Sequence, residues 1–375
     1  MRFTMSLSFK TISADSHVVE PPDLWTKRID RRFLDRAPRI VGGEDTDYLV
    51  VPEEMGGKRG IGLVSAALKK NEEISMNGRF AEVLPGGYDP AARLEDQDRD
   101  NVEAEILYTS FGLTMYKIED LDFQFACMQA FNDWLANFCA SAPNRFYGAA
   151  MIPTQPLERG IQEMRRCADM GVFRTAQISI NHDAGHGYNS TEWDPLWATA
   201  EELQMPLSLH VAGSKKSFSV TNDPMTDFCL AFTEVMYQIS RMVISGVFDR
   251  FRDLKVVSVE NDAAWLVGVL ERMDYLVERS PGWAGPTGIT SGRKPSEIFH
   301  EHVFCTFMRD QSAVKSRDIV GVKNILWGSD YPHIDSTWPH STKVLEDHFD
   351  GVPLEDQQRI ARQNAIELYH LPLAP

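Results

Sequence analysis

The residues whose types and spacing could perform chemistry stand at the ends of four short apolar runs. The segment Asp15-Ser16-His17 closes the first run, and side chains two positions apart on a strand point the same way. A carboxylate and an imidazole should therefore leave this strand end together. Three later runs each end in another side chain that can bind a metal: His210, Glu260 and Asp330. Nitrogen and oxygen ligands at four strand ends predict one metal centre.

The types of ligand restrict both the metal and its chemistry. His17 and His210 offer neutral nitrogens, while Asp15, Glu260 and Asp330 offer oxygens. This mixture suits zinc, manganese or iron better than magnesium or calcium. A catalytic metal keeps one position for water and lowers the pKa of that water toward ~7, so that hydroxide exists at neutral pH. Asp330 is then either a direct ligand or the general base on this water, and the sequence leaves both roles open.

The elements that must position these residues follow a strand and helix alternation. Eight apolar or β-branched runs recur, at 12–17, 103–108, 146–152, 175–180, 206–211, 255–260, 302–307 and 324–330. Segments with helical periodicity lie between most of them, such as 123–140, 156–170, 194–204 and 228–251. This alternation implies βαβ units and a parallel sheet. Eight such units most naturally close into a (β/α)8 TIM barrel, whose active site lies at the C-terminal strand ends, where all the candidate ligands fall.

An open, doubly wound sheet is the alternative architecture. It predicts a glycine-rich turn after the first strand. This chain has Asp15-Ser16-His17 there instead, so the barrel is the preferred interpretation.

Two stretches interrupt the regular alternation. Residues 26–92 carry glycine, proline and mixed charge, and residues 280–297 form a second irregular insertion. Long insertions in compact domains tend to be lids, substrate-binding loops or subunit contacts. We therefore expect residues 1–375 to form one domain, in which residues 26–92 act as a cap.

Composition and missing motifs exclude several classes of protein. The chain has 375 residues, of which 43% are hydrophobic and 25% charged, as in globular proteins. Its net charge of −16, without a basic patch, argues against a nucleic-acid partner. No run approaches ~18 apolar residues and the start lacks a secretory pattern, which predicts a cytoplasmic protein without a membrane partner. Five scattered cysteines are expected to be buried thiols. No G-x-S-x-G elbow supports a serine hydrolase.

Several motifs together resemble those of a known family. They are Asp15-Ser16-His17 with Glu20-Pro21-Pro22, Trp193-Asp194-Pro195-Leu196-Trp197, the strand ending in His210, Glu271-Arg272-Met273-Asp274, and Trp327-Gly328-Ser329-Asp330-Tyr331-Pro332-His333. From about residue 12 to Leu371 the chain is similar to the amidohydrolase-related family, in the branch of the aminocarboxymuconate semialdehyde decarboxylase type. The resemblance implies a TIM barrel in which Asp15, His17, His210 and Asp330 hold one divalent metal. It also implies decarboxylation of aromatic or dienoic acids or hydrolysis of carbon–carbon, ester or amide bonds, and a homodimer.

One departure from the family pattern affects the expected mechanism. Family decarboxylases usually end the sixth strand in a histidine, whereas this chain has Glu260-Asn261-Asp262. An ionised glutamate cannot donate a hydrogen bond. Glu260 is therefore a structural acid, a general base or an additional metal ligand, and the sequence leaves these roles open. As a ligand, with Glu20, His182 or His333, it would complete a site suited to non-haem iron, including a dinuclear centre that activates oxygen.

The functional expectation is a metal-dependent hydrolase or decarboxylase acting on a small aromatic or carboxylated molecule. Asp330, Glu260 and His210 are the candidate catalytic residues, with Asp330 handling the proton. Arg309, Trp25 and Tyr108 are candidates for substrate binding, although arginines on loops are usually solvated and aromatic residues usually pack in the core. The alternative function is an iron-dependent oxygenase on the same barrel. A barrel that only binds a metabolite is the least favoured interpretation, because the ligand set looks complete.

Overall fold

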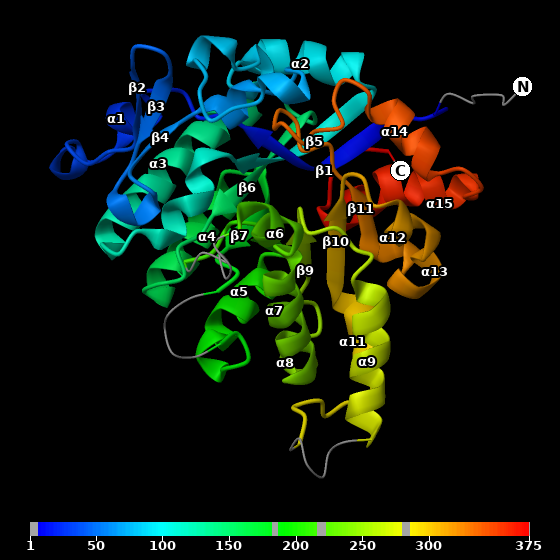
Figure 1. Cartoon of the computed structure of the whole chain (residues 1–375). Coiled ribbons are helices and arrows are strands. Elements are labelled where there is room, and N and C mark those ends of the chain that lie inside the picture. Colours follow the sequence, from blue (N-terminus) through cyan, green and yellow to red (C-terminus); the bar gives the residue numbers. More distant parts are fainter. Residues whose placement is uncertain (1–6, 182–186, 216–222, 280–285, 375) are drawn as a thin grey trace, which may run out of the picture.

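The centre of the molecule is an eight-stranded parallel barrel (Figure 1). The computed structural model describes residues 7–181, 187–215, 223–279 and 286–374. The barrel strands, in their order of pairing, are β1 Thr11–Val18, β5 Val102–Thr109, β6 Phe146–Met151, β7 Phe173–Ile178, β8 Leu207–His210, β9 Val256–Val259, β10 Val303–Phe307 and β11 Ile325–Trp327. Each of the eight predicted runs overlaps one of these strands, so the prediction of a (β/α)8 barrel is confirmed.

Hydrogen bonds between β1 and the residues that follow β11 bring the barrel close to closure. The Asp330 amide donates to the Asp15 carbonyl at 2.9 Å, and the His17 amide donates to the Tyr331 carbonyl at 2.7 Å. The Ser329 amide donates to the Ser13 hydroxyl at 2.8 Å. These bonds exclude the open sheet, whose first and last strands would lie apart.

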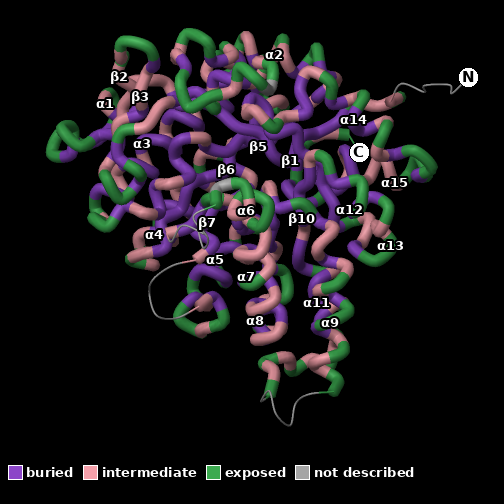
Figure 2. Tube along the Cα trace, in the orientation of Figure 1, coloured by how far each residue is buried: buried purple, intermediate pink, exposed green. Residues whose placement is uncertain are grey.

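Helices surround the barrel, and the strands are buried between them (Figure 2). The α-helices of the described residues are α1 Leu24–Arg28, α2 Pro90–Arg99, α3 Leu121–Ala140, α4 Leu157–Asp169, α5 Asp194–Glu202, α6 Pro224–Cys229, α7 Phe232–Ile244, α8 Val247–Arg250, α9 Leu266–Arg279, α11 Pro295–His302, α12 Gln311–Lys315, α13 Arg317–Val320, α14 Ser341–His348, α15 Leu354–Gln358 and α16 Asn364–Leu368. The four predicted helical segments correspond to α3, α4, α5 and α7, although α3 begins two residues before its predicted start. The last segment is broken after α7 because Gly246 takes a left-handed φ of 75°.

The insertion after β1 contains its own small sheet. Strands β2 Arg39–Gly42, β3 Asp47–Val50 and β4 Lys58–Gly60 pair antiparallel. Short turns connect them to each other and to the barrel: η1 Arg31–Phe33, η2 Glu53–Met55, η3 Gly62–Ser65, η4 Asn71–Glu73, η5 Phe80–Glu82 and η6 Pro85–Gly87. Phe33, Leu49 and Met55 belong to the same hydrophobic cluster as the residues between the barrel and its helices. The insertion is therefore packed into the common core.

The structure corrects two smaller expectations. Residues 280–285 of the second irregular segment lie outside the described residues, but helix α11 begins at Pro295, inside the stretch predicted to be irregular. Proline suits the first turn of a helix because the missing N–H would have no partner there. All five cysteines are free, and four are buried as predicted, but Cys229, at the end of the short helix α6, is exposed.

The remaining short helical turns are η7 Phe111–Lys117, η8 Thr191–Trp193, η9 Val322–Asn324 and the π-turn η10 Arg359–Gln363. Within the residues that the structure describes, no helix has the length and apolar character needed to cross a membrane.

Candidate metal centre

A bulge in β1 orients the first two candidate ligands. Ser13 pairs with Glu105 and Ser16 with Leu107, so β1 has one residue more than β5 over this stretch. Such an extra residue changes the local direction of the strand and re-aims its side chains. Asp15 and His17 are both buried, and Asp15 Oδ1 lies 3.6 Å from His17 Nε2. The bulge thus brings a carboxylate and an imidazole to one point inside the barrel.

Backbone carbonyls fix the orientation of both imidazoles. His17 Nδ1 lies 2.8 Å from the Thr109 carbonyl oxygen, and His210 Nδ1 lies 2.9 Å from that of Val211. Because a carbonyl oxygen only accepts, each Nδ1 carries a hydrogen and each Nε2 is left for another partner. The two Nε2 atoms face one another at 3.1 Å. Two nitrogen lone pairs at this distance require a proton or a metal cation between them.

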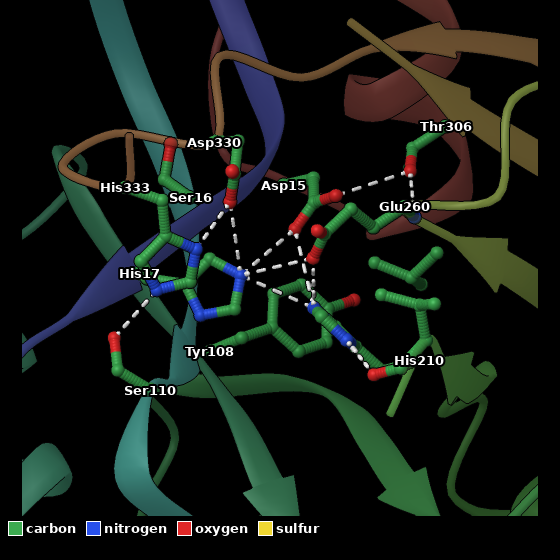
Figure 3. Close-up of polar contacts among 12 residues, drawn as sticks. Asp15, Ser16, His17, Tyr108, Ser110, His210, Glu260, Thr306, Asp330 and His333 are labelled. Atoms are coloured by element: carbon green, nitrogen blue, oxygen red, sulfur yellow. Dashed lines mark hydrogen bonds and ion pairs between the residues drawn. The ribbon is translucent and has the colours of Figure 1, made fainter. Parts of the chain in front are cut away.

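Three carboxylates surround these two nitrogens (Figure 3). Asp15 Oδ1 lies 3.6 Å from His210 Nε2, and Asp330 Oδ1 lies 3.3 Å from His17 Nε2. Glu260 Oε2 lies 3.7 Å from His17 Nε2 and 3.5 Å from His210 Nε2. The structure therefore brings together all five predicted ligands, from β1 and from the ends of β8, β9 and β11.

The electrostatics of the cluster call for a cation. Burial lowers the pKa of His17, assisted by the neighbouring imidazoles. Burial also lowers the pKa of His210, but the charges of Asp15 and Glu260 outweigh this effect and raise it. Burial raises the pKa of Glu260 and of Asp330, and the neighbouring carboxylates raise it further. A bound metal ion would take the place of the protons that the raised pKa values of His210, Glu260 and Asp330 favour.

Unsatisfied oxygens test whether the site fits a metal. Asp15 Oδ1 and both carboxylate oxygens of Asp330 are buried and have no hydrogen-bond partner among the described residues. Leaving buried charged groups unpaired is strongly unfavourable. Carboxylate oxygens and neutral imidazole nitrogens are the ligands that divalent transition metals use in proteins. The residues therefore fit a divalent metal, which Asp15, His17, His210, Asp330 and Glu260 could hold.

The backbone at two of the ligands is strained. Glu260 has a φ of 58° and Asp330 a φ of 54°, a left-handed conformation that costs a non-glycine residue roughly 1–3 kcal/mol. Hydrogen bonds hold both turns, from the Glu260 amide to Thr306 Oγ1 at 2.8 Å and from the Asp330 amide to the Asp15 carbonyl at 2.9 Å. The strands end before these residues, at 259 and 327. The chain thus turns sharply to direct each carboxylate into the site.

His333 adds a second group of possible ligands. His333 Nδ1 lies 2.9 Å from Asp330 Oδ1 in an ion-pair contact that lacks hydrogen-bond geometry, and its Nε2 lies 2.8 Å from Ser110 Oγ. His17, Glu260, Asp330 and His333 form one cluster with metal-binding spacing, and Asp15, His17 and His210 form another. Of the further ligands suggested by sequence, Glu20 instead accepts hydrogen bonds from the Phe111 and Gly112 amides, and His182 lies outside the described residues.

The sequence did not reveal the buried pair that supports β1. Arg93 and Glu105 are buried, with Arg93 Nε donating to Glu105 Oε2 at 2.7 Å and Nη2 donating to Oε1 at 3.0 Å. Arg93 Nη1 also donates to the His17 carbonyl at 2.7 Å, and Glu105 accepts from Ser16 Oγ at 2.9 Å. A glutamate inside the apolar run of β5 was the available signal, because charged residues are rarely buried without a partner.

The three candidates for substrate binding lie in different surroundings. Tyr108 is buried beside the cluster, with its ring centroid 5.0 Å from that of His210 and its hydroxyl 2.9 Å from Ser208 Oγ. Trp25 is buried in the core, where its Nε1 donates to the Cys127 carbonyl at 3.1 Å. Arg309 is exposed, and its Nη2 makes a long 3.4 Å contact with the Ser336 carbonyl. Only Tyr108 is thus in contact with the candidate ligands, and the substrate roles stay predictions.

The chain belongs to the amidohydrolase family, because the family's sequence model matches residues 14–371. It is 26% identical over 270 residues to the 2-amino-3-carboxymuconate-6-semialdehyde decarboxylase of Dictyostelium discoideum, which covers 69% of this chain and 71% of the relative. It is also 26% identical over 257 residues to a gamma-resorcylate decarboxylase of a Rhizobium species, which covers 64% of this chain and 75% of the relative.

Solved structures share the barrel. An amidohydrolase from Mycobacterium avium subsp. paratuberculosis superposes with a TM-score of 0.78 at 19% identity, covering 97% of this chain and all (100%) of that one. The 5-carboxyvanillate decarboxylase of Novosphingobium aromaticivorans, solved with manganese, has a TM-score of 0.70 at 19% identity and covers 97% of each chain. At this level of identity the likeness establishes the fold.

Proposed function

We propose that this protein is a metal-dependent decarboxylase that acts on a small aromatic or similarly unsaturated carboxylic acid. The observation that carries the proposal is the pair of oriented imidazoles at the C-terminal end of a TIM barrel. Their Nε2 atoms lie 3.1 Å apart and face two buried carboxylates, Asp15 and Asp330, and the partly buried Glu260. The decarboxylases among the relatives support the reaction type. They share the family and cover most of the chain.

The residues of this chain would divide the work of such a reaction. A divalent metal bound by these ligands would supply positive charge that binds and orients the carboxylate or a neighbouring oxygen of the substrate. The bond between the ring carbon and the carboxylate breaks, its electron pair stays on the ring carbon, carbon dioxide leaves, and a proton is added to that carbon. We assign this proton to Asp330. His333, beside Asp330 and Ser110, is placed to restore it.

The test is a decarboxylation assay with the metal-loaded enzyme. Hydroxylated benzoic acids should release carbon dioxide, and in heavy water the product should carry deuterium at the carbon that lost the carboxylate. Asp330→Asn should lower this rate by roughly 10²–10⁴-fold, whereas Asp350→Asn, at an exposed position outside the cluster, should retain it. Hydrolysis of esters or amides without any release of carbon dioxide would refute the proposal.

A dinuclear iron oxygenase is the second candidate, and a specific observation favours it. The cluster of His17, Glu260, Asp330 and His333 offers ligands for a second ion beside the one near Asp15 and His210. Carboxylate-rich sites with few histidines suit non-haem iron. This candidate would be favoured by two irons per chain, one of which is lost in His333→Ala, and by turnover that stops without oxygen. One metal per chain and turnover that does not depend on oxygen would favour the decarboxylase.

Three structural and cellular predictions remain part of the proposal. We expect residues 26–92 to cap the site, and the packing of η2 against η7, the loop that follows β5, supports this role. We also expect a homodimer and a cytoplasmic location. Light scattering at micromolar concentration should give twice the chain mass of 42.4 kDa, and the monomer mass would contradict the dimer.

A further inference from the structure

The side chain of Gln177 is a buried amide without a partner. Gln177 lies in β7 and is fully buried, and neither its Nε2 nor its Oε1 has a hydrogen-bond partner within the described part of the chain. Its backbone carbonyl, in contrast, accepts from the Ile152 amide at 2.9 Å and from the Tyr116 hydroxyl at 2.7 Å. Buried polar groups are rarely left unpaired in native proteins. The amide therefore calls for a partner beyond the described residues, such as a bound molecule.

Strand alternation places this amide inside the barrel. Thr175, two residues earlier on β7, points inward, because its Oγ1 lies 2.7 Å from Ser208 Oγ, which in turn lies 2.9 Å from the hydroxyl of Tyr108. Side chains two apart on a strand share a face. Gln177 consequently points inward as well, one step closer to the C-terminal end than Thr175.

The amide lies beside the strand that ends in the ligand His210. Gln177 pairs with Ser208 in the sheet register, and His210 follows two residues later on the same face of β8. A Cβ atom placed on Gly213 would lie 3.4 Å from Gln177 Nε2 and 2.8 Å from the His210 carbonyl oxygen. Gln177 Nε2 is thus adjacent to the turn that follows His210.

We infer that Gln177 is a specificity-determining residue whose amide binds a hydroxyl group on the acid held at the metal centre. This inference rests on the proposed function for the identity of that acid. A primary amide offers two donors and one acceptor, which match a hydroxyl group that both donates and accepts. The amide carries no charge, so a second carboxylate at this position would be buried without a cation. The preferred substrate is accordingly a hydroxylated monocarboxylic acid.

The test compares Gln177→Met with the wild type, both loaded with Mn²⁺. Methionine is similar in size and apolar, so it removes the unpaired groups with little change in packing. Calorimetric titration with 2-hydroxybenzoate and with benzoate gives the ratio of their affinities. We expect the wild type to prefer 2-hydroxybenzoate by roughly 10-fold or more, as for a site that binds a substrate hydroxyl. Gln177→Met should bring the ratio near one without weakening benzoate.

A second measurement separates recognition from a structural role. Because the amide is unpaired, Gln177→Met should melt at the same temperature as the wild type or higher, while Thr175→Val, which loses existing hydrogen bonds, should melt lower. A lower melting temperature for Gln177→Met, an unchanged affinity ratio, or a wild type that prefers neither acid would overturn the inference. Neither measurement needs turnover. A wild type that prefers 2-hydroxybenzoate but releases no carbon dioxide would therefore refute the proposed decarboxylase activity and leave the role of Gln177 standing.

Discussion

The buried Arg93–Glu105 ion pair should stabilise β1, the strand that carries the ligands Asp15 and His17, and this effect can be measured. Arg93→Met removes both donors to Glu105 and the donor to the His17 carbonyl. The carboxylate of Glu105 would remain buried, and among the described residues it would keep only Ser16 and Gln97 as side-chain donors. Breaking a buried ion pair in this way typically costs about 3–5 kcal/mol. We expect a loss of that size in the free energy of unfolding.

The assay is urea unfolding of Arg93→Met, Glu105→Gln and the double variant. Because each single change strands its partner, the double variant should lose less than the sum of the two single losses. The matched control is Arg145→Met. Arg145 Nη2 lies 2.8 Å from Asp98 Oδ1, and the Asp98 side chain is 60% exposed. This ion pair should contribute about 1 kcal/mol or less to the free energy of unfolding. Metal affinity should also fall by roughly 10–100-fold in Arg93→Met, as for other residues that orient a ligand. A loss below about 1 kcal/mol, or strictly additive losses, would refute the reasoning.

Two further predictions concern stability. Burial raises the pKa of Asp100 to about 6 from an ordinary value of 3.8, so the folded state binds this proton more tightly than the unfolded state does. Proton binding by Asp100 therefore stabilises the folded protein by at most about 3 kcal/mol. This stabilisation is complete below the ordinary pKa and is lost as the pH rises through about 6. The difference in unfolding free energy between wild type and Asp100→Asn should therefore change across this window, and a constant difference would contradict the assignment. Gly328→Ala should destabilise the protein by roughly 1–3 kcal/mol, because the added Cβ would lie 2.5 Å from Asp15 Cβ. Gly268→Ala in helix α9 is the control: its Cβ would meet nothing within 4 Å, so this variant should be as stable as the wild type or more stable. Equal melting temperatures for the two glycine variants would count against this packing.

The sequence predicted what depends on local periodicity. Each barrel strand is a short apolar run, and ligands at the ends of parallel strands must meet at one edge, so the barrel and the convergence of Asp15, His210 and Asp330 followed from the pattern. The left-handed turns at Glu260 and Asp330 did not follow, because neighbouring strands impose them through hydrogen bonds to Thr306 and Asp15. The predicted strand runs that end at Glu260 and Asp330 were consequently too long.

Residues whose meaning depends on distant partners were also not predictable. Arg93 could only be recognised as a support of the site once β1 and β5 were paired and its hydrogen bonds to Glu105 and His17 were known. The amide of Gln177 likewise has no signature in the sequence, because being unpaired is a property of the folded barrel. Long-range pairing decides both cases.

The metal content of the purified protein tests the central claim most directly. Protein prepared without chelators should contain at least about one divalent transition metal per chain by elemental analysis, in keeping with metal sites whose ligands are preformed by the fold. His210→Ala removes an oriented nitrogen ligand and should lose most of this metal, while His370→Ala, an exposed residue outside the cluster, should retain it. A wild type that binds no divalent metal, or a His210→Ala variant with unchanged metal content, would contradict the assignment of this site.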